Sequence, residues 1–208
     1  MSQNPIKVAV LVSGGGTNLQ ALIDAQKAGK ITDGVLSLVV SNKPDAYALM
    51  RAKTAGIPTA VVQKKECGTR EAFEAKIRAV LDANGIGLIV LAGFMCILSE
   101  SFTSAYPRRI LNVHPSLIPS FCGEGFYGLH VHEAALAYGV KVTGATVHFV
   151  NEITDGGDII AQKAVEVLPG DTPETLQRRV MEQAEWILLA QALEQVAGEI
   201  AKKREEKQ

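Results

Sequence analysis

Apolar, β-branched runs alternate with segments of helical periodicity along the first two thirds of the chain. Short runs bounded by glycine, proline or polar residues predict strands near residues 6–13, 35–41, 59–63, 88–92 and 110–114. The segments between them carry apolar residues three and four positions apart and end near a glycine, which predicts helices over residues 18–28, 46–55 and 70–84. This alternation predicts an α/β fold: an open, mostly parallel, doubly wound sheet with helices on both faces.

The last third of the chain has a different pattern. Strands predicted over residues 145–150 and 158–167 are separated by a loop too short for a crossover helix, so we expect them to pair antiparallel. A short helix is predicted over 130–138, and a long amphipathic helix is predicted from the capping sequence at 171–174 to about Gly198. The closing run KKREEKQ is expected to be a solvated, fraying end. The sheet should hold about seven strands, and residues 1–208 should form a single domain.

Composition narrows the classes of function. At 208 residues with 47% hydrophobic content, the chain can bury a sizeable core. Lys and Arg total 21 against 22 for Asp and Glu, so the basic excess typical of nucleic-acid binding is absent and no such partner is expected. No run approaches the roughly 18 apolar residues of a membrane span, which predicts a soluble, cytoplasmic protein. Cys67, Cys96 and Cys122 form no C-x-x-C pair, so reduced thiols and no metal site are predicted.

The sequence SGGGTN at residues 13–18 lies where the first predicted strand turns into the first helix. Backbone N–H groups at a helix start favour an anion, and open α/β sheets bind ligands at the carboxyl ends of their strands. The dinucleotide pattern G-x-G-x-x-G fails because Leu19 stands where the third glycine belongs, and no lysine follows as in a P-loop. We therefore expect Gly16, Thr17 and Asn18 to hold a sugar phosphate. The alternative is a plain glycine turn with Thr17 as helix cap.

Two polar residues flank one valine at the end of the fifth predicted strand. Asn112 and His114 should point to the same face, because side chains on a strand alternate with period two. Asp155 stands in a second loop before a Gly-Gly pair. An amide, an imidazole and a carboxylate can stabilise a tetrahedral oxyanion and move a proton, and the carboxylate should keep the histidine charged at neutral pH. The alternatives are strand-end residues that cap their own backbone and an aspartate that caps its own turn.

Four stretches, SGGGTNLQALI, VLAGFMCIL, LNVHPSLIPSF and FVNEITDGGDIIAQ, resemble the phosphoribosylglycinamide formyltransferase family over essentially the whole chain. The string HPSLIPSF is typical of the wider superfamily that uses 10-formyltetrahydrofolate, and the glycine loop in combination with it indicates the branch that acts on glycinamide ribonucleotide. The resemblance implies a cytoplasmic enzyme of de novo purine biosynthesis that transfers the formyl group of 10-formyltetrahydrofolate to the ribonucleotide amine. It implies small-molecule partners, no metal, and a monomer or homodimer.

The resemblance also implies roles for individual residues. The N-terminal half would bind the nucleotide, with Gly16, Thr17 and Asn18 at its phosphate, and the C-terminal half would bind folate and carry the catalytic group Asn112, His114 and Asp155. The residues implied to contact folate are Arg70, Met95, Cys96, Ile97, Leu98 and Asn112.

Three further assignments follow from the same resemblance. Gly128, in a loop longer than that of some members, would approach the substrate. Glu185 resembles the glutamate that contacts the ribose, in a local match that needs a one-residue shift, and Glu182 lies nearby. Cys96 stands where many members carry Arg or Lys, which leaves a backbone contact there.

Other functions and other side chains share parts of this pattern. A formyltetrahydrofolate hydrolase would use the same three catalytic residues with water as nucleophile, a methionyl-tRNA formyltransferase would need an added RNA-binding domain, and a non-catalytic nucleotide-binding regulator would need only the glycine loop. His148 is predicted to be either a packed core residue or a wall of the site, whereas His130 and His132 are expected to be exposed. Cys96 and Cys122 lack a base partner, so thiol catalysis is not expected.

Overall fold

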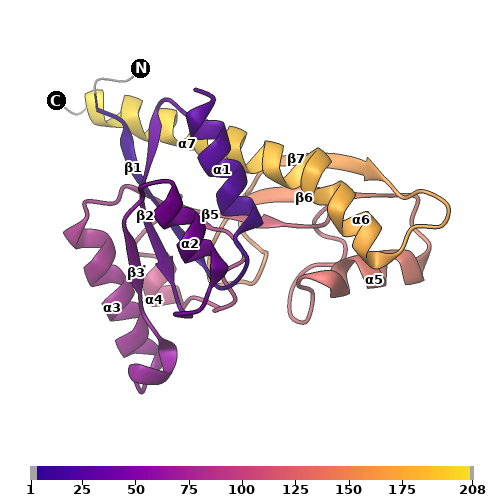
Figure 1. Cartoon of the computed structure of the whole chain (residues 1–208), viewed down its shortest axis with the longest axis horizontal. Helices are drawn as coiled ribbons and strands as arrows, with labels where there is room; N and C mark the ends of the chain where they lie inside the picture. The colour runs from indigo at the N-terminus through magenta and orange to yellow at the C-terminus, as the bar shows by residue number, and fades with distance from the viewer. Residues whose placement is uncertain (1–3, 207–208) are drawn as a thin grey trace.

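A seven-stranded sheet in the order β3-β2-β1-β4-β5-β6-β7 runs through the computed structural model, which describes residues 4–206 (Figure 1). Its strands are β1 (Ile6–Val12), β2 (Gly34–Ser41), β3 (Thr59–Val61), β4 (Leu88–Leu91), β5 (Ile110–His114), β6 (Val142–Phe149) and β7 (Ile159–Glu166). Pairing is parallel from β3 to β5 and antiparallel from β5 to β7. The predicted mostly parallel sheet with an antiparallel C-terminal portion is therefore confirmed.

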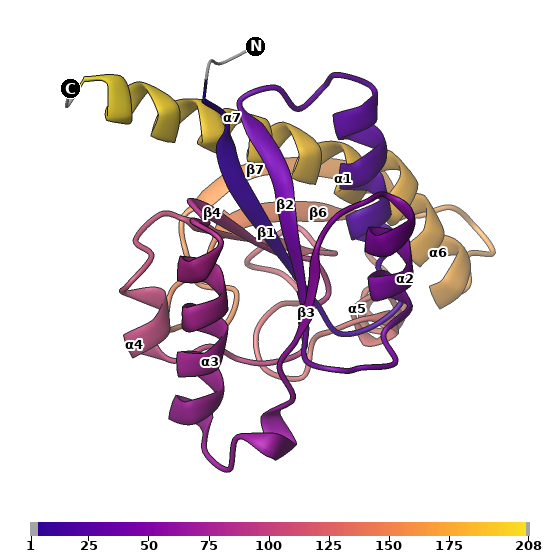
Figure 2. The same ribbon diagram turned by 60° about the vertical axis from the view of Figure 1, so that its left-hand side comes forward.

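Helices cover both faces of this sheet, as predicted (Figure 2). They are α1 (Thr17–Lys27), α2 (Tyr47–Thr54), α3 (Arg70–Ala83), α4 (Glu100–Thr103), α5 (Leu129–Tyr138), α6 (Pro173–Val180) and α7 (Trp186–Glu205). Alternate residues of β1 separate the two cores: Val8 and Val10 pack with α1, α2 and α7, whereas Ala9 and Leu11 pack with α3 and α4. Residues on a buried central strand face helices on both sides, which explains why β1 is apolar from Val8 to Val12.

The C-terminal helix differs from the prediction in its length. It continues past Gly198 to Glu205, so the prediction that the helix ends near Gly198 was wrong. Residues 202–206 are exposed, as expected of a solvated end, and residues 207–208 lie outside the described part of the chain. A Cβ at Gly198 would lie 2.8 Å from Oδ2 of Asp33, so the glycine permits a close approach to the residue before β2 and does not end the helix. Lys202 and the two basic residues after it favour the negative end of the helix dipole.

The predicted long helix is also interrupted. Thr172 caps α6, with its side chain accepting from the Thr175 N–H at 3.3 Å, as expected from the capping sequence. After α6, residues Met181–Glu185 form a π-helical turn before α7 begins. A π turn holds one residue more than an α turn, and such turns are frequent at functional sites.

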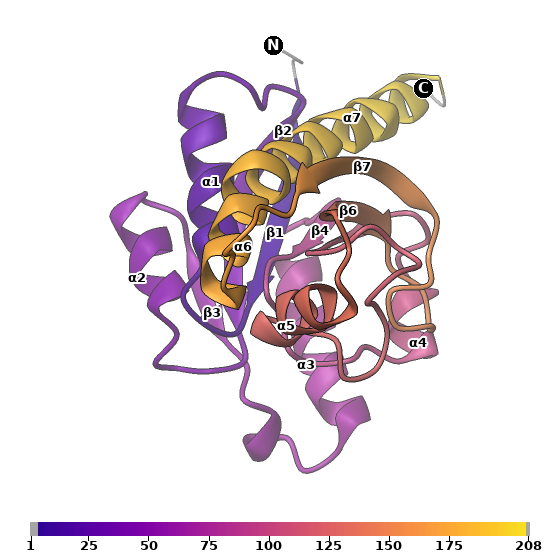
Figure 3. The same cartoon turned by 90° about the vertical axis from the view of Figure 1, so that its right-hand side faces the viewer.

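The antiparallel strands β6 and β7 extend the sheet past β5, and α5 packs against α6 (Figure 3). β6 begins at Val142, three residues earlier than predicted. Short elements escaped prediction altogether, namely α4 and a 3-10 turn at Lys64–Glu66. Within residues 4–206, no helix combines the length and apolar character needed to cross a membrane.

Candidate active site

Three functional segments meet at the carboxyl edge of the parallel strands. The register aligns Leu11 of β1 with Leu91 of β4, and Leu91 with Asn112 of β5. Neighbouring strands lie about 4.8 Å apart, so β1 and β5 are separated by about 10 Å at this level. The glycine loop follows β1, the segment 92–98 follows β4, and Asn112 with His114 ends β5. Open α/β sheets bind their ligands at this edge.

The three predicted catalytic side chains come together here. His114 Nδ1 lies 3.4 Å from Asp155 Oδ2, and Asn112 Nδ2 lies 3.5 Å from Asp155 Oδ1. His114 is buried, and only 9% of the Asp155 side chain is exposed. Asp155 therefore contacts residues outside its own turn, unlike in the alternative in which it only caps that turn. The loop brings Asp155 to the site at a φ of 55°, a left-handed conformation rare for residues other than glycine.

His114 has an acceptor on each ring nitrogen. Nε2 lies 2.8 Å from the carbonyl oxygen of Phe121, and Nδ1 faces the Asp155 carboxylate. Carbonyl and carboxylate oxygens only accept hydrogen bonds, so the two contacts together fit an imidazole protonated on both nitrogens. A substrate oxygen that accepts from Nε2 must take the place of the Phe121 carbonyl.

The Asp155 carboxylate is held in its ionised form. Burial opposes ionisation, but a hydrogen bond from His148, the charge of His114 and the N–H of Gly123 outweigh it and lower the pKa of Asp155 below its usual value. The Gly123 N–H donates to Oδ2 at 2.9 Å. This contact ties the loop after β5 to the loop that carries Asp155.

A fourth side chain, His148 of β6, completes the cluster. It is directly opposite Asn112 in the antiparallel register, with its Nε2 3.2 Å from Asn112 Nδ2 and 3.6 Å from Asp155 Oδ1. Its Nδ1 lies 2.8 Å from the carbonyl of Phe149, which requires a proton on Nδ1. His148 is thus a buried wall of the site, the second of the two roles predicted for it. Knowledge of the register between β5 and β6 would have placed His148 beside Asn112.

The other two histidines differ from each other. The His130 side chain is 60% exposed, as expected. The expected exposure of His132 was wrong: it is fully buried on the inner face of α5, and neither ring nitrogen has a hydrogen-bond partner within the described chain. Burial and the nearby charge of His114 lower the pKa of His132 to about 4, so this imidazole is neutral at physiological pH.

The two cysteines near these segments are thiols. Burial raises the pKa of Cys96, opposed by the hydrogen bond from Asn42, and burial together with the Asp155 charge raises the pKa of Cys122. A raised pKa disfavours the nucleophilic thiolate.

The glycine loop presents backbone N–H groups and has no side-chain cap. The N-cap of α1 is Gly16, at φ 72°, so the alternative in which Thr17 caps the helix is wrong. Thr17 is exposed in the first turn, where helix N–H groups lack partners inside the helix. Asn18 differs from the expectation that its side chain faces a phosphate, because Nδ2 donates to Glu185 Oε2 at 3.0 Å. Asn18 can therefore offer a phosphate its backbone N–H.

Glu185 lies against the glycine loop, whereas Glu182 is exposed. The π turn that ends at Glu185 turns this side chain inward, where it is 6% exposed. Burial raises the pKa of Glu185 to about 7, and the hydrogen bond from Asn18 opposes part of that shift. Of the two glutamates considered, Glu185 is placed to reach a ligand whose phosphate sits on the loop.

The raised pKa of Glu185 gives a test by pH. A carboxyl whose folded-state pKa lies above its unfolded value of about 4.5 stabilises the fold at low pH, and that contribution is lost as pH rises through about 7. Between pH 4.5 and 8, the unfolding free energy of Glu185→Gln should improve relative to wild type by about 3 kcal/mol. Urea unfolding across this range measures it. Glu182→Gln, in the same turn but exposed, is the matched control. Identical pH profiles of unfolding free energy for the two variants would contradict a raised pKa of Glu185.

The segment after β4 is anchored on two sides. Met95 N–H donates to Ser13 Oγ at 2.8 Å, and Arg70 Nη2 donates to the carbonyl of Ile97 at 3.0 Å. Behind it, the buried carboxylate of Glu74 accepts from Arg70 Nε at 3.2 Å and from Ser99 N–H at 2.7 Å. Sequence reasoning did not single out Glu74.

The side chains of this segment divide into exposed and buried ones. Met95 is 55% and Ile97 64% exposed, which leaves an apolar surface at the carboxyl edge. Leu98 is buried in the core, so only its backbone can meet a ligand, and the Cys96 sulfur accepts from Asn42 Nδ2 at 3.1 Å. Gly128, at φ 56°, is exposed and starts α5. In residues 4–206, no three His, Cys, Asp or Glu side chains are arranged to hold a metal ion.

Comparisons with known proteins show what the chain is similar to in sequence and in fold. Residues 6–193 match the model of a family described as formyl transferase. The trifunctional purine biosynthetic protein adenosine-3 of Gallus gallus is 48% identical over 195 residues, 94% of this chain but only 19% of that protein. Phosphoribosylglycinamide formyltransferase of Haemophilus influenzae is 44% identical over 177 residues, 85% of this chain and 81% of the relative. The crystal structure of glycinamide ribonucleotide transformylase 1 from Symbiobacterium toebii has a TM-score of 0.87 and 42% identity, covering 93% of this chain and 88% of that chain.

Proposed function

Because the chain belongs to the formyl transferase family, we propose that it is a phosphoribosylglycinamide formyltransferase of purine biosynthesis. It transfers the formyl group of 10-formyltetrahydrofolate to the amine of 5-phosphoribosylglycinamide and releases tetrahydrofolate. The observation that carries this proposal is the cluster of Asn112, His114 and Asp155 at the carboxyl edge, beside the glycine loop. A ribonucleotide with its phosphate on that loop would extend its glycinamide along the same edge toward β5.

The cluster supplies what formyl transfer requires. Attack of a neutral amine on the formyl carbon forms a C–N bond and leaves a negative oxygen and a positive nitrogen. Asn112 Nδ2 and protonated His114 donate to the oxygen, and Asp155 balances the charge of His114. The amine loses a proton, the bond from the formyl carbon to the folate nitrogen breaks, and that nitrogen gains a proton, so charge and protons balance.

The segment 93–98 fits a reduced folate. A flat pterin ring offers hydrogen-bonding edges and apolar faces, and this segment offers backbone groups beside the exposed Met95 and Ile97 side chains. Arg70 lies next to it, with its guanidinium on the Ile97 carbonyl. We assign the folate contacts to Arg70, to the 95–98 backbone and to Asn112. The free cysteines of the chain accord with a cytoplasmic enzyme.

A single assay tests the proposal. The protein is incubated with 10-formyltetrahydrofolate, and the folate absorbance is followed with and without glycinamide ribonucleotide. Turnover that depends on the ribonucleotide is expected. Turnover without it would identify a formyltetrahydrofolate hydrolase, and ribonucleotide binding without turnover would identify a non-catalytic regulator.

A substitution in the glycine loop tests where the phosphate binds. Gly16 is unsuitable, because a Cβ there would lie 2.6 Å from the Ala48 Cβ and would disturb α2. A Cβ at Gly15 meets no protein atom within 4 Å, so Gly15→Val should leave the fold intact while its side chain competes with the anion for space. We expect ribonucleotide affinity to fall about tenfold or more, which corresponds to about 1.4 kcal/mol.

Calorimetry with each ligand separately measures this effect, and thermal unfolding checks the fold. Folate affinity should stay within twofold of wild type, because the folate contacts lie on other segments. Equal weakening of both ligands in a folded variant would contradict the placement of the phosphate on this loop.

A further inference from the structure

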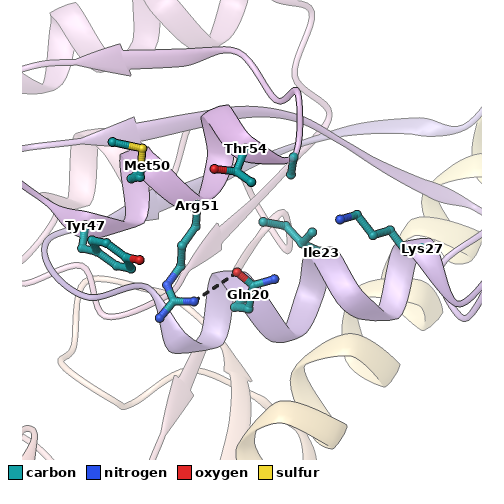
Figure 4. A pocket seen from close by; sticks show the side chains of 8 residues that line it. Gln20, Ile23, Lys27, Tyr47, Met50, Arg51 and Thr54 are labelled. Carbon is teal, nitrogen blue, oxygen red and sulfur yellow. Dashed lines mark hydrogen bonds between the residues drawn. The ribbon is translucent and has the colours of Figure 1, made fainter.

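A surface pocket between α1 and α2 lies behind the glycine loop, and Arg51 is its central polar residue (Figure 4). Arg51 extends from α2 to α1, where Nη1 donates to Gln20 Oε1 at 3.1 Å. Its guanidinium carbon lies 5.0 Å from the centre of the Tyr47 ring. These contacts hold the guanidinium in one orientation, so its remaining donors have a fixed direction.

Two carbonyl groups of the glycine loop are bonded to α2. The N–H of Ala48 donates to the carbonyl of Gly14 at 3.0 Å, and Arg51 Nε donates to the carbonyl of Gly15 at 2.8 Å. Gly16 lies so close to Ala48 that even a methyl group would not fit between them. The loop is thus packed against and hydrogen-bonded to the same helix.

Peptide geometry converts these bonds into a direction for the loop N–H groups. In a trans peptide the C=O of one residue and the N–H of the next point in opposite directions. Since the Gly14 and Gly15 carbonyls point toward α2, the N–H groups of Gly15 and Gly16 point away from it. Among the hydrogen bonds of residues 4–206, none uses either of these N–H groups. They are free to bind an anion on the side of the loop opposite α2.

Arg51 also brings positive charge to a loop that has none of its own. The stretch 13–18 contains no Lys or Arg. A guanidinium bonded to the loop backbone therefore favours an anion there by its charge, in addition to fixing the loop shape.

We propose that Arg51 is a positioning residue for phosphate binding: its hydrogen bond to the Gly15 carbonyl aims the Gly15 and Gly16 N–H groups at the phosphate without touching the ligand itself. This inference rests on the proposed function for the identity of the ligand. The orientation of the loop N–H groups can be measured without any ligand, which separates the two proposals.

Three variants test the inference: Arg51→Gln, Arg51→Lys and the control Lys53→Gln, an exposed cation on the same helix. Calorimetry with glycinamide ribonucleotide should show affinity reduced about 10- to 100-fold in Arg51→Gln, the range for a lost hydrogen bond to a charged group. Arg51→Lys keeps a charged donor and should recover most of this loss. Affinity for the reduced folate, and kcat at saturating ribonucleotide, should remain within twofold in all three variants.

Amide NMR of the ligand-free proteins supplies the independent measurement. The Gly15 and Gly16 amide signals should move in Arg51→Gln and stay in place in Lys53→Gln. Unmoved signals, unchanged ribonucleotide affinity, or equal loss of both ligands would each overturn the inference. If wild type binds no ribonucleotide while the Arg51→Gln signals move, the role of Arg51 in the loop stands and the proposed function falls.

Discussion

Replacing Asp155 with asparagine is expected to reduce kcat for formyl transfer by about 10²- to 10⁴-fold, the range for losing a group that controls a proton-transferring side chain. The side chain keeps its shape, but the charge that faces His114 Nδ1 at 3.4 Å is removed. The amide oxygen of asparagine can still accept from the imidazole, but it does not balance a positive charge there, so we expect the proposed cationic donor to the oxyanion to be lost. If the ribonucleotide phosphate binds on the glycine loop as proposed, ribonucleotide affinity should change little. Steady-state kinetics with both substrates varied measures the two effects separately.

Asp158→Asn is the matched control for this variant. Asp158 follows in the same stretch of chain, but its side chain is 77% exposed and pairs with Arg108 on the surface. Its replacement should leave kcat within twofold of wild type. If Asp155→Asn retained kcat within threefold, the carboxylate would have no role in the chemical step.

Replacing Asn112 with alanine is expected to reduce kcat by about 10²- to 10³-fold, the usual cost of removing one donor to an oxyanion. In the ligand-free protein one N–H of Asn112 faces His148 at 3.2 Å, and the other faces Asp155 at 3.5 Å, the limit of hydrogen-bonding distance. A negative oxygen can replace the longer contact, to Asp155, at little cost in free energy. Stopped-flow measurement of a single turnover isolates the chemical step from product release.

Asn84→Ala is a suitable control, because Asn84 is the exposed C-cap residue of α3 and its side chain donates to the carbonyl of Val80 in that helix. A single-turnover rate for Asn112→Ala within threefold of wild type would contradict the assignment of Asn112 as an oxyanion donor. Circular dichroism should accompany both measurements, since removal of the Asn112 side chain also removes a polar neighbour of the buried His148 Nε2.

The sheet and its covering helices could be predicted because they depend on local patterns. Runs such as residues 8–12 and 88–91 are apolar throughout, as required of strands buried on both faces. The four-residue helix α4 gives no periodic signal, so it was missed. Gly198 was read as a helix end, whereas a Cβ there would approach Asp33, a residue far away in sequence, and no local pattern reports such an approach.

Within the site, too, features set by local patterns could be predicted, and features set by tertiary contacts could not. Asn112 and His114 share a face because of strand periodicity alone. The role of His148 depends on which residue of β5 it opposes, and the burial of His132 depends on which face of α5 is turned into the protein. Both depend on tertiary contacts. The sequence therefore left the role of His148 undecided and wrongly predicted that His132 is exposed. The anchoring of the glycine loop by Arg51 is likewise a contact between helices.

The π turn at Met181–Glu185 affects the direction of every side chain that follows it in α7. One residue inserted into an ordinary helix turns every later side chain by about 100° around its axis. A wide turn absorbs the extra residue, so the apolar stripe of α7 keeps its phase toward the sheet and Glu185 still meets Asn18. The same five residues therefore set both the direction of the Glu185 side chain toward the glycine loop and the packing of α7 on the sheet.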